Sequence, residues 1–251
     1  MTNKSLNEAL VSFVLPAYNE GAVIGDTLER LDSRFLGNGF PYEIVVVDDG
    51  SVDDTRLRAL SYCAGKGHVR VIGYDRNVGK GFAVKKGFME AKGEAVVFFD
   101  SDSDIDVGQI QVCLDSLKSA DIAIGSKWLP DSVVEMSLVR KLLSRGFNAL
   151  ARLLTGVAVS DTQTGIKAVR RDAFLDVFGR LCVKRYAFDA ELLVLAKLYG
   201  LRVTEIPVKL KLDRLFSLSE VWRMFVDLLG ISYRLRVTKW YARGISEYSH
   251  L

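Results

Sequence analysis

The first half of the chain alternates short apolar runs with longer stretches whose apolar residues recur at helical spacing. The apolar runs span residues 11–15, 43–47, 69–73, 95–99 and 122–124, and they are rich in β-branched and aromatic side chains, as strands are. The helical pattern occupies residues 22–35, 54–63, 81–91 and 107–117. This alternation predicts an α/β, Rossmann-like fold with a mostly parallel sheet covered by helices on both faces.

The second half adds amphipathic helices to this core. Residues 138–154 carry a leucine-rich face and four basic residues without an acidic one, which predicts a strongly amphipathic helix. Further strands are expected at 165–169 and 203–208, and further helices at 189–199 and 219–233. Without a repeat or a low-complexity linker, the simplest organisation is a catalytic domain over residues 1–215 and a helical extension over 216–251.

Composition narrows the class of protein. The chain has 251 residues, 49% hydrophobic and 26% charged, which is typical of a globular protein. A net charge of +3 gives no reason to expect nucleic acid as a partner. Three widely spaced cysteines offer no disulfide framework, so a reducing compartment is expected. No apolar run approaches the roughly 18 residues of a transmembrane helix, so none is expected.

Polar residues cluster where the predicted strands end. The clusters are residues 16–20, 48–51, 100–104 and 125–127. One acidic strand end is usually a helix cap, but ligands of open α/β sheets bind beyond the carboxyl ends of the strands. Several such clusters on one edge therefore indicate a binding site.

Three aspartates alternate in one of these clusters. Asp100, Asp102 and Asp104 would repel one another unless a cation neutralised them, and Mg²⁺ or Mn²⁺ prefers such oxygen ligands. A calcium loop is the competing interpretation, but Ile105 stands where that loop needs Gly and Gln111 where it needs Glu. The cluster therefore favours a divalent metal that also binds substrate phosphates.

The order and spacing of four motifs resemble glycosyltransferase family 2, whose members are inverting enzymes of the GT-A fold. The motifs are Pro-Ala-Tyr-Asn-Glu at 16–20, Val-Val-Asp-Asp-Gly-Ser at 46–51, Asn-Val-Gly-Lys-Gly at 77–81 and Asp-Ser-Asp at 100–102. Residues 125–127, 161–165, 170–172, 188–191 and 205–208 further resemble the branch that makes dolichyl-phosphate mannose and dolichyl-phosphate glucose. The resemblance covers roughly residues 10–215.

This resemblance implies roles for individual residues. The nucleotide-sugar donor would be held by Pro16, Ala17, Tyr18, Glu20, Asp49, Lys80, Asp100 and Asp102, and the metal by Asp100, Asp102 and Asp104. The implied catalytic residues are Asp102, Lys127, Arg140, Ser144 and Arg214. Lys127 replaces the Arg that is usual in the mannosyl branch. Arg140 and Ser144 match residues that hold the acceptor phosphate, and Arg214 matches an Arg near the diphosphate. The Ser-Lys pair expected after that Arg is not intact, because Leu218 and Glu220 follow Ser217 and Ser219.

The implied reaction transfers a hexose from a nucleoside diphosphate to a polyprenyl phosphate. Because the acceptor phosphate is already an anion near neutral pH, it needs positioning more than a general base. The motif at 161–165 resembles glucosyl-phosphate synthases, whereas Arg140 and Ser144 resemble mannosyl-phosphate synthases, and GDP-mannose is expected over UDP-glucose. The sequence leaves the oligomeric state open.

The apolar helices predict a peripheral enzyme on the cytoplasmic face of a membrane. The helix at 138–154 and the tail from Ser217, with its alternating aromatic and basic residues, are suited to an anionic lipid surface. Alternatively, both apolar faces pack against the sheet or a second subunit.

Three other functions compete. A soluble transferase acting on a hydroxyl would need a base, for which Asp189 and Glu191 are the candidates. A binding protein with a degenerate site would not need the Asp100 and Asp102 pair. A nicotinamide dehydrogenase would want Gly at Val84 to complete its fingerprint.

Overall fold

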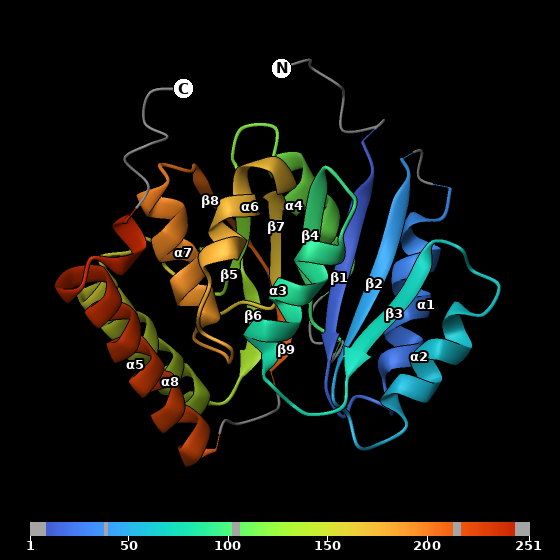
Figure 1. Cartoon of the computed structure of the whole chain (residues 1–251), viewed down its shortest axis with the longest axis horizontal. Coiled ribbons are helices and arrows are strands. Elements are labelled where there is room, and N and C mark those ends of the chain that lie inside the picture. Colours follow the sequence, from blue (N-terminus) through green and yellow to red (C-terminus); the bar gives the residue numbers. More distant parts are fainter. Residues whose placement is uncertain (1–8, 38–39, 102–105, 213–216, 244–251) are drawn as a thin grey trace.

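A seven-stranded sheet forms the centre of the molecule (Figure 1). The computed structural model describes residues 9–37, 40–101, 106–212 and 217–243. The strand order is β3-β2-β1-β4-β7-β5-β8. The strands are β1 (Val11–Ala17), β2 (Tyr42–Asp49), β3 (Val69–Tyr74), β4 (Ala95–Phe99), β5 (Ile122–Ser126), β7 (Ile166–Arg170) and β8 (Val203–Pro207).

Helices cover both faces of this sheet and bury two apolar clusters. One cluster lies under α1 (Ile24–Phe35), α2 (Thr55–Cys63) and α4 (Gln109–Ser116). The other lies under α3 (Lys80–Glu90), α6 (Arg171–Arg180) and α7 (Phe188–Leu198). The predicted α/β fold with a mostly parallel sheet is therefore confirmed.

The sheet is mixed because β7 runs antiparallel to both of its neighbours, β4 and β5. An apolar strand pattern is the same in either direction, so this orientation was not predictable from residues 165–169. The structure also contains a small second sheet of β6 (Val133–Met136) and β9 (Lys209–Leu212), which the sequence pattern did not indicate. Helix α6 was missed as well, since it starts directly after β7 without a side-chain cap.

The two amphipathic helices lie side by side at the edge of the molecule (Figure 1). They are α5 (Leu138–Thr155) and α8 (Leu218–Ser232). Their C-terminal ends meet, since the Ser232 hydroxyl donates a hydrogen bond of 3.1 Å to the Leu154 carbonyl. The two helices therefore run in the same direction and bring their N-terminal ends together.

The end of the chain is integrated into the main core. After α8 come a π-helical turn (Tyr233–Val237) and a short 3-10 turn (Trp240–Ala242). Leu228, Ile231 and Tyr241 are fully buried in the same cluster as α7. The expected domain boundary falls within residues 213–216, outside the described residues, and stays a prediction. Within the described ranges, no helix is long and apolar enough to cross a bilayer.

Candidate active site

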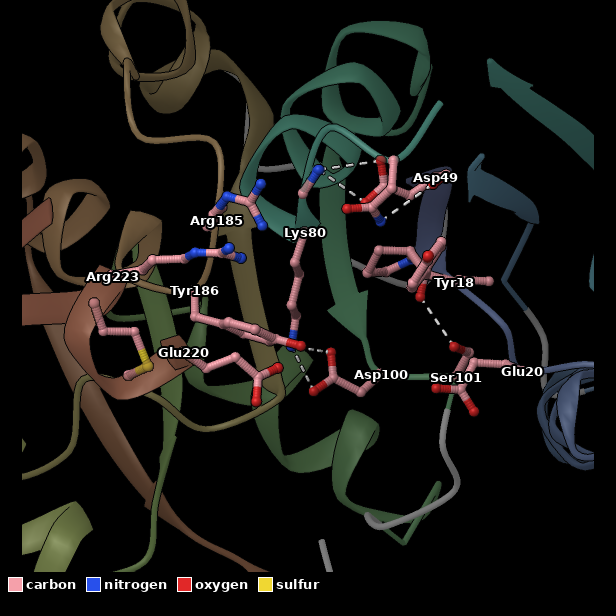
Figure 2. Close-up of a pocket in the computed structure, with 15 residues that line it drawn as sticks. Tyr18, Glu20, Asp49, Lys80, Asp100, Ser101, Arg185, Tyr186, Glu220 and Arg223 are labelled. Carbon is pink, nitrogen blue, oxygen red and sulfur yellow. Dashed lines mark hydrogen bonds and ion pairs between the residues drawn. The ribbon is translucent and has the colours of Figure 1, made fainter. Parts of the chain in front are cut away.

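A cavity of about 250 Å³ opens beyond the carboxyl ends of β1, β2 and β4. Figure 2 shows the side chains that surround it, which come from these strand ends on one side and from α8 and the segment before α7 on the other. The lining residues are Pro16, Ala17, Tyr18, Glu20, Asp49, Asn77, Gly79, Lys80, Asp100, Ser101, Arg185, Tyr186, Glu220, Arg223 and Met224.

Every described residue that was expected to hold the donor lines this cavity. These are Pro16, Ala17, Tyr18, Glu20, Asp49, Lys80 and Asp100. They come from four separate segments of the chain, so the fold brings together what the motifs indicated. Their individual roles in binding remain predictions.

Hydrogen bonds join the loop after β1 to the loop after β2. The Asn19 backbone, in the left-handed region at φ 55°, donates to the Ser51 hydroxyl at 3.0 Å, and the Val52 backbone donates to Asn19 Oδ1 at 3.0 Å. The Glu20 backbone donates to the Thr55 hydroxyl at 2.8 Å. These bonds fix the backbone that carries Tyr18 and Glu20 against the edge of the cavity.

The Asp49 carboxylate organises a third loop. It accepts hydrogen bonds from the backbone of Val78 at 2.8 Å and of Gly79 at 2.9 Å, and from the Asn77 amide at 2.9 Å. Gly79 has φ 123°, and a Cβ there would lie 2.4 Å from the Lys184 carbonyl oxygen. The loop can therefore lie close to the segment before α7, and it places Lys80 at the start of α3.

Lys80 and Asp100 form an ion pair in the cavity. The Lys80 Nζ atom lies 2.5 Å from Asp100 Oδ1 and 2.6 Å from Oδ2 (Figure 2). Gly165 provides the space for this carboxylate, because a Cβ at that position would lie 2.1 Å from Asp100 Oδ2. The Asp100 backbone also donates to the Gly165 carbonyl at 3.2 Å. The glycine of the motif at 161–165 thus determines where Asp100 lies.

The predicted metal site is described only in part. Asp100 lies in the cavity, whereas Asp102 and Asp104 lie outside the described residues. In the part of the chain that the structure describes, no three potential Asp, Glu, His or Cys ligands lie close together. The Asp100 carboxylate already attracts a cation, the Lys80 ammonium, and its oxygens are the donors that Mg²⁺ and Mn²⁺ prefer.

Lys127 is buried beside Asp161 and does not line the cavity. Its Nζ atom lies 2.7 Å from Asp161 Oδ2, and the Lys127 backbone donates to the same oxygen at 3.0 Å. Burial alone would raise the pKa of Asp161. The Lys127 ammonium and a hydrogen bond from Thr164 outweigh burial and lower this pKa to about 2. The expected phosphate contact of Lys127 stays a prediction.

Arg140 and Ser144 lie one turn apart on α5, outside the cavity lining. One turn further along the same face, Asn148 is buried and its Oδ1 atom accepts hydrogen bonds from the Thr162 backbone at 2.9 Å and hydroxyl at 2.8 Å. Asn148, Ser144 and Arg140 therefore form a row along α5 that runs from the buried 161–165 loop towards the protein surface. Arg214, the other expected phosphate ligand, lies outside the described residues.

The two candidate bases have different surroundings. Glu191 is fully buried and accepts hydrogen bonds from the backbone of Cys182 and Val183 and from the Tyr241 hydroxyl. It therefore stabilises the packing of these segments on α7. Asp189 is also buried, and burial raises its pKa although the nearby Lys167 ammonium, 2.9 Å away, opposes this. Neither residue lines the cavity.

The second wall of the cavity was not predicted from the sequence. It consists of Arg185, Tyr186, Glu220, Arg223 and Met224. The available signals were that Arg185 and Tyr186 lie just before the motif at 188–191, and that Glu220 follows the Arg expected near the diphosphate. The contribution of α8 depends on how this helix packs, which no local pattern shows.

Comparison with known proteins identifies the family. The model of the family described as "Glycosyl transferase family 2" matches residues 12–178. The chain belongs to this family. The match covers β1 to α6 and thus every strand-end loop of the cavity.

Several glycosyltransferases are similar to this family 2 member over nearly its whole length. The human dolichyl-phosphate beta-glucosyltransferase is 34% identical over 92% of this chain and 77% of its own. A protein of that name from Drosophila melanogaster is 34% identical over 94% and 78%. Glycosyltransferase AglD of Haloferax volcanii is 33% identical over 92% of this chain, which covers 37% of that protein.

A solved structure confirms the fold. Glucosyl-3-phosphoglycerate synthase from Mycobacterium tuberculosis, in complex with Mn²⁺, UDP and glucosyl-3-phosphoglycerate, has a TM-score of 0.68 at 23% identity, over 90% of this chain and 79% of that one. The expectation of GDP-mannose gains no support from these proteins, because those whose names state a sugar are glucosyltransferases or a glucosyl synthase.

Proposed function

We propose that this protein transfers glucose from UDP-glucose to a polyprenyl phosphate of the dolichyl type. The observation that carries the proposal is the 34% identity to the human dolichyl-phosphate beta-glucosyltransferase over 92% of the chain. The cavity supports it, because the family's donor motifs converge there. Glucose is proposed in place of the mannose expected from Arg140 and Ser144, because similarity to glucosyltransferases along nearly the whole chain is stronger support than a match at two positions.

In the proposed reaction, a phosphate oxygen of the lipid attacks the anomeric carbon of glucose. The bond between that carbon and the β-phosphate oxygen breaks, UDP leaves with the electron pair, and the configuration inverts. The attacking oxygen is already an anion, so no base is required. This agrees with the absence of Asp189 and Glu191 from the cavity lining.

Asp100 and Asp102 would hold Mg²⁺ or Mn²⁺, as the carboxylate in the cavity and the motif after β4 suggest. When bound, such an ion stabilises negative charge on a leaving diphosphate. The Lys80 ammonium, which lies in the same cavity, would add positive charge at the same place. Asp49 would act indirectly, because its carboxylate fixes the loop that carries Lys80.

The exposed ends of α5 and α8 support a lipid acceptor. Leu138 is 83% exposed and Leu218 is 89% exposed, at the adjoining N-terminal ends of the two helices. Leu142 and Trp222 extend the apolar surface along each helix, at 73% and 64% exposure. Lys141 and Arg145 are exposed on the same part of α5. Apolar side chains beside basic ones suit the surface of an anionic membrane, and we propose that the enzyme docks there peripherally.

A donor panel tests the proposal. The protein is incubated with Mn²⁺, a short-chain polyprenyl phosphate, and UDP-glucose, GDP-mannose or UDP-galactose in turn, and the glycolipid is measured. We expect product from UDP-glucose and at least tenfold less from the other donors. Preferential transfer from GDP-mannose would restore the mannosyl interpretation, and transfer to a hydroxyl acceptor without lipid phosphate would refute the proposed acceptor.

A further inference from the structure

The charges around the cavity are divided between its two walls. Glu20, Asp49 and Asp100 lie at the strand ends, whereas the opposite wall carries Arg185, Arg223 and one carboxylate, Glu220, with Lys80 between the walls (Figure 2). We propose that Arg185 and Arg223 form a subsite for a phosphoryl anion. The inference deepens the proposed function and rests on it for the identity of the ligand.

The two arginines differ from Lys80 in what they contact. The Lys80 ammonium is held by the Asp100 carboxylate. The guanidinium groups of Arg185 and Arg223 make no hydrogen bond or ion pair within the described residues. Figure 2 shows both groups directed towards Lys80 and the middle of the cavity. Their planar donors suit the oxygens of a phosphate, which guanidinium groups bind in a bidentate way.

The backbone on which Arg185 stands is fixed. The Lys184 carbonyl accepts a hydrogen bond of 3.1 Å from the Phe82 backbone, and the Arg185 carbonyl accepts one of 3.2 Å from Phe188. The close approach of Gly79, the residue before α3, to Lys184 adds a second contact between this segment and the start of α3. The base of the side chain is therefore held in place before a ligand arrives.

Arg223 is held in place by the packing of α8. Met224, the next residue, is 4% exposed, and Leu228 is fully buried one turn later. The N-terminal end of the helix is closed by a capping box between Ser217 and Glu220. Arg223 therefore projects from a rigid helix into the cavity.

Two carboxylates lie near the arginines. Glu220 lines the cavity and accepts hydrogen bonds from the Ser217 backbone at 2.7 Å and hydroxyl at 2.8 Å. Asp227 lies one turn after Arg223, and burial raises its pKa although the charges of Arg185 and Arg234 oppose this. Neither carboxylate forms an ion pair with Arg185 or Arg223, and within the described ranges both guanidinium groups are thus available to an anion from solution.

Two parts of the reaction could supply that anion, the donor diphosphate and the phosphate of the lipid acceptor. Both present oxygens of the same chemistry. Three kinds of measurement on Arg185→Ala and Arg223→Ala separate them. Lys184→Ala is the matched control, because its side chain is exposed, adjacent to Arg185 and not part of the cavity lining. Arg223→Lys tests whether the fork geometry matters beyond the charge.

The first measurement is calorimetry with inorganic pyrophosphate in EDTA, so that no metal bridges the anion to a carboxylate. The second compares UDP with UMP, with Mn²⁺ present. The third is the KM for a short-chain polyprenyl phosphate at saturating UDP-glucose. We expect each alanine variant to weaken pyrophosphate binding about tenfold, because a hydrogen bond to a charged group is lost, and Lys184→Ala to resemble the wild type.

The second and third measurements identify the source. A loss of UDP affinity of about tenfold with little change for UMP assigns the subsite to the donor β-phosphate. A raised KM for the lipid with unchanged UDP affinity assigns it to the acceptor. If both variants match Lys184→Ala in all three measurements, the subsite does not exist. A wild type that binds pyrophosphate through these arginines without using UDP-glucose would retain the subsite and refute the proposed function.

Discussion

The two walls of the cavity are built in different ways. The strand-end wall, with Tyr18, Asp49 and Asp100, belongs to loops that are bonded to one another through side chains such as Asn19 and Asp53. The helical wall, with Tyr186 and Arg223, depends on how α8 and the segment before α7 pack on the core. The first wall is held by specific hydrogen bonds between loops, so the change of one side chain should disturb it. The second is specified by tertiary packing, and its outer surface is exposed.

The largest effect is expected outside both walls, at the buried ion pair of Lys127 and Asp161. Asp161 contacts Lys127 after β5, and Asn148 of α5 donates to its Oδ1 atom at 3.4 Å. Asp161→Asn leaves the Lys127 ammonium buried without its counter-charge, and breaking a buried pair typically costs about 3–5 kcal/mol of unfolding free energy. Chemical denaturation at pH 7 measures this loss. Asp115→Asn, which removes an exposed pair with Lys118, should change stability by less than about 1 kcal/mol.

The same substitution should alter the dependence of stability on pH. The pKa of Asp161 is about 2 in the folded protein, below the roughly 3.9 of an unfolded aspartate. Its contribution is therefore present above about pH 4 and is lost as the pH falls towards 2. The wild type should lose more stability than Asp161→Asn over this interval. Parallel curves for the two proteins would show that the pair is not responsible.

The strand-end wall should be broken chemically by Asp100→Asn. Loss of this carboxylate removes the partner of Lys80 and a proposed metal ligand, and we expect kcat/KM to fall by about 10²–10³-fold, the effect of removing one charge-stabilising group. Asp75→Asn is the matched control, because Asp75 also follows a strand but is fully exposed and outside the cavity. Near-normal turnover of the Asp100 variant would remove Asp100 from the mechanism.

A purely steric change should disturb the same wall somewhat less. In Gly165→Ala the new methyl group would collide with Asp100 Oδ2 and displace this carboxylate. A displacement of about 1 Å can cost about 10²-fold in rate, and we expect a loss of this size with little change in melting temperature. Gly146→Ala introduces the same methyl group on α5, where no atom beyond the neighbouring residues and the helix's own backbone lies within 4 Å, and should leave kcat unchanged. Equal rates for the two variants would show that Gly165 does not position Asp100.

The exposed apolar surface of α8 and of its neighbour α5 should show the smallest effect. Leu142→Ser and Trp222→Ser should each weaken binding to anionic vesicles about tenfold, because each removes apolar area from the proposed contact. Vesicle flotation measures the binding, and calorimetry should show unchanged affinity for UDP. Leu57→Ser removes a leucine that is 67% exposed on α2, on the other side of the sheet, and serves as the control. Vesicle binding that is insensitive to all three substitutions would contradict docking through α5 and α8.

The contrast between the walls also explains what the sequence could predict. Parallel strands carry their loops to one edge, so motifs in the correct order were enough to place Glu20, Asp49 and Lys80 together. Strand direction, as in β7, and helix placement, as in α8, depend on contacts between distant residues. The pairing of Lys127 with Asp161, 34 residues away, was likewise not visible in the sequence, and the phosphate contact expected of Lys127 from the family resemblance stays a prediction.

Helix α8 is a single element of 15 residues whose two sides have different surroundings. Arg223 and Met224 line the cavity, whereas Trp222 and Leu218 are exposed on the outside. A ligand that engages the inner side and a surface that engages the outer side act on the same rigid body. Any coupling between them is reciprocal, so the factor by which attachment strengthens ligand binding is also the factor by which the ligand strengthens attachment. The time that the protein stays attached to such a surface would then depend on whether a ligand occupies its cavity.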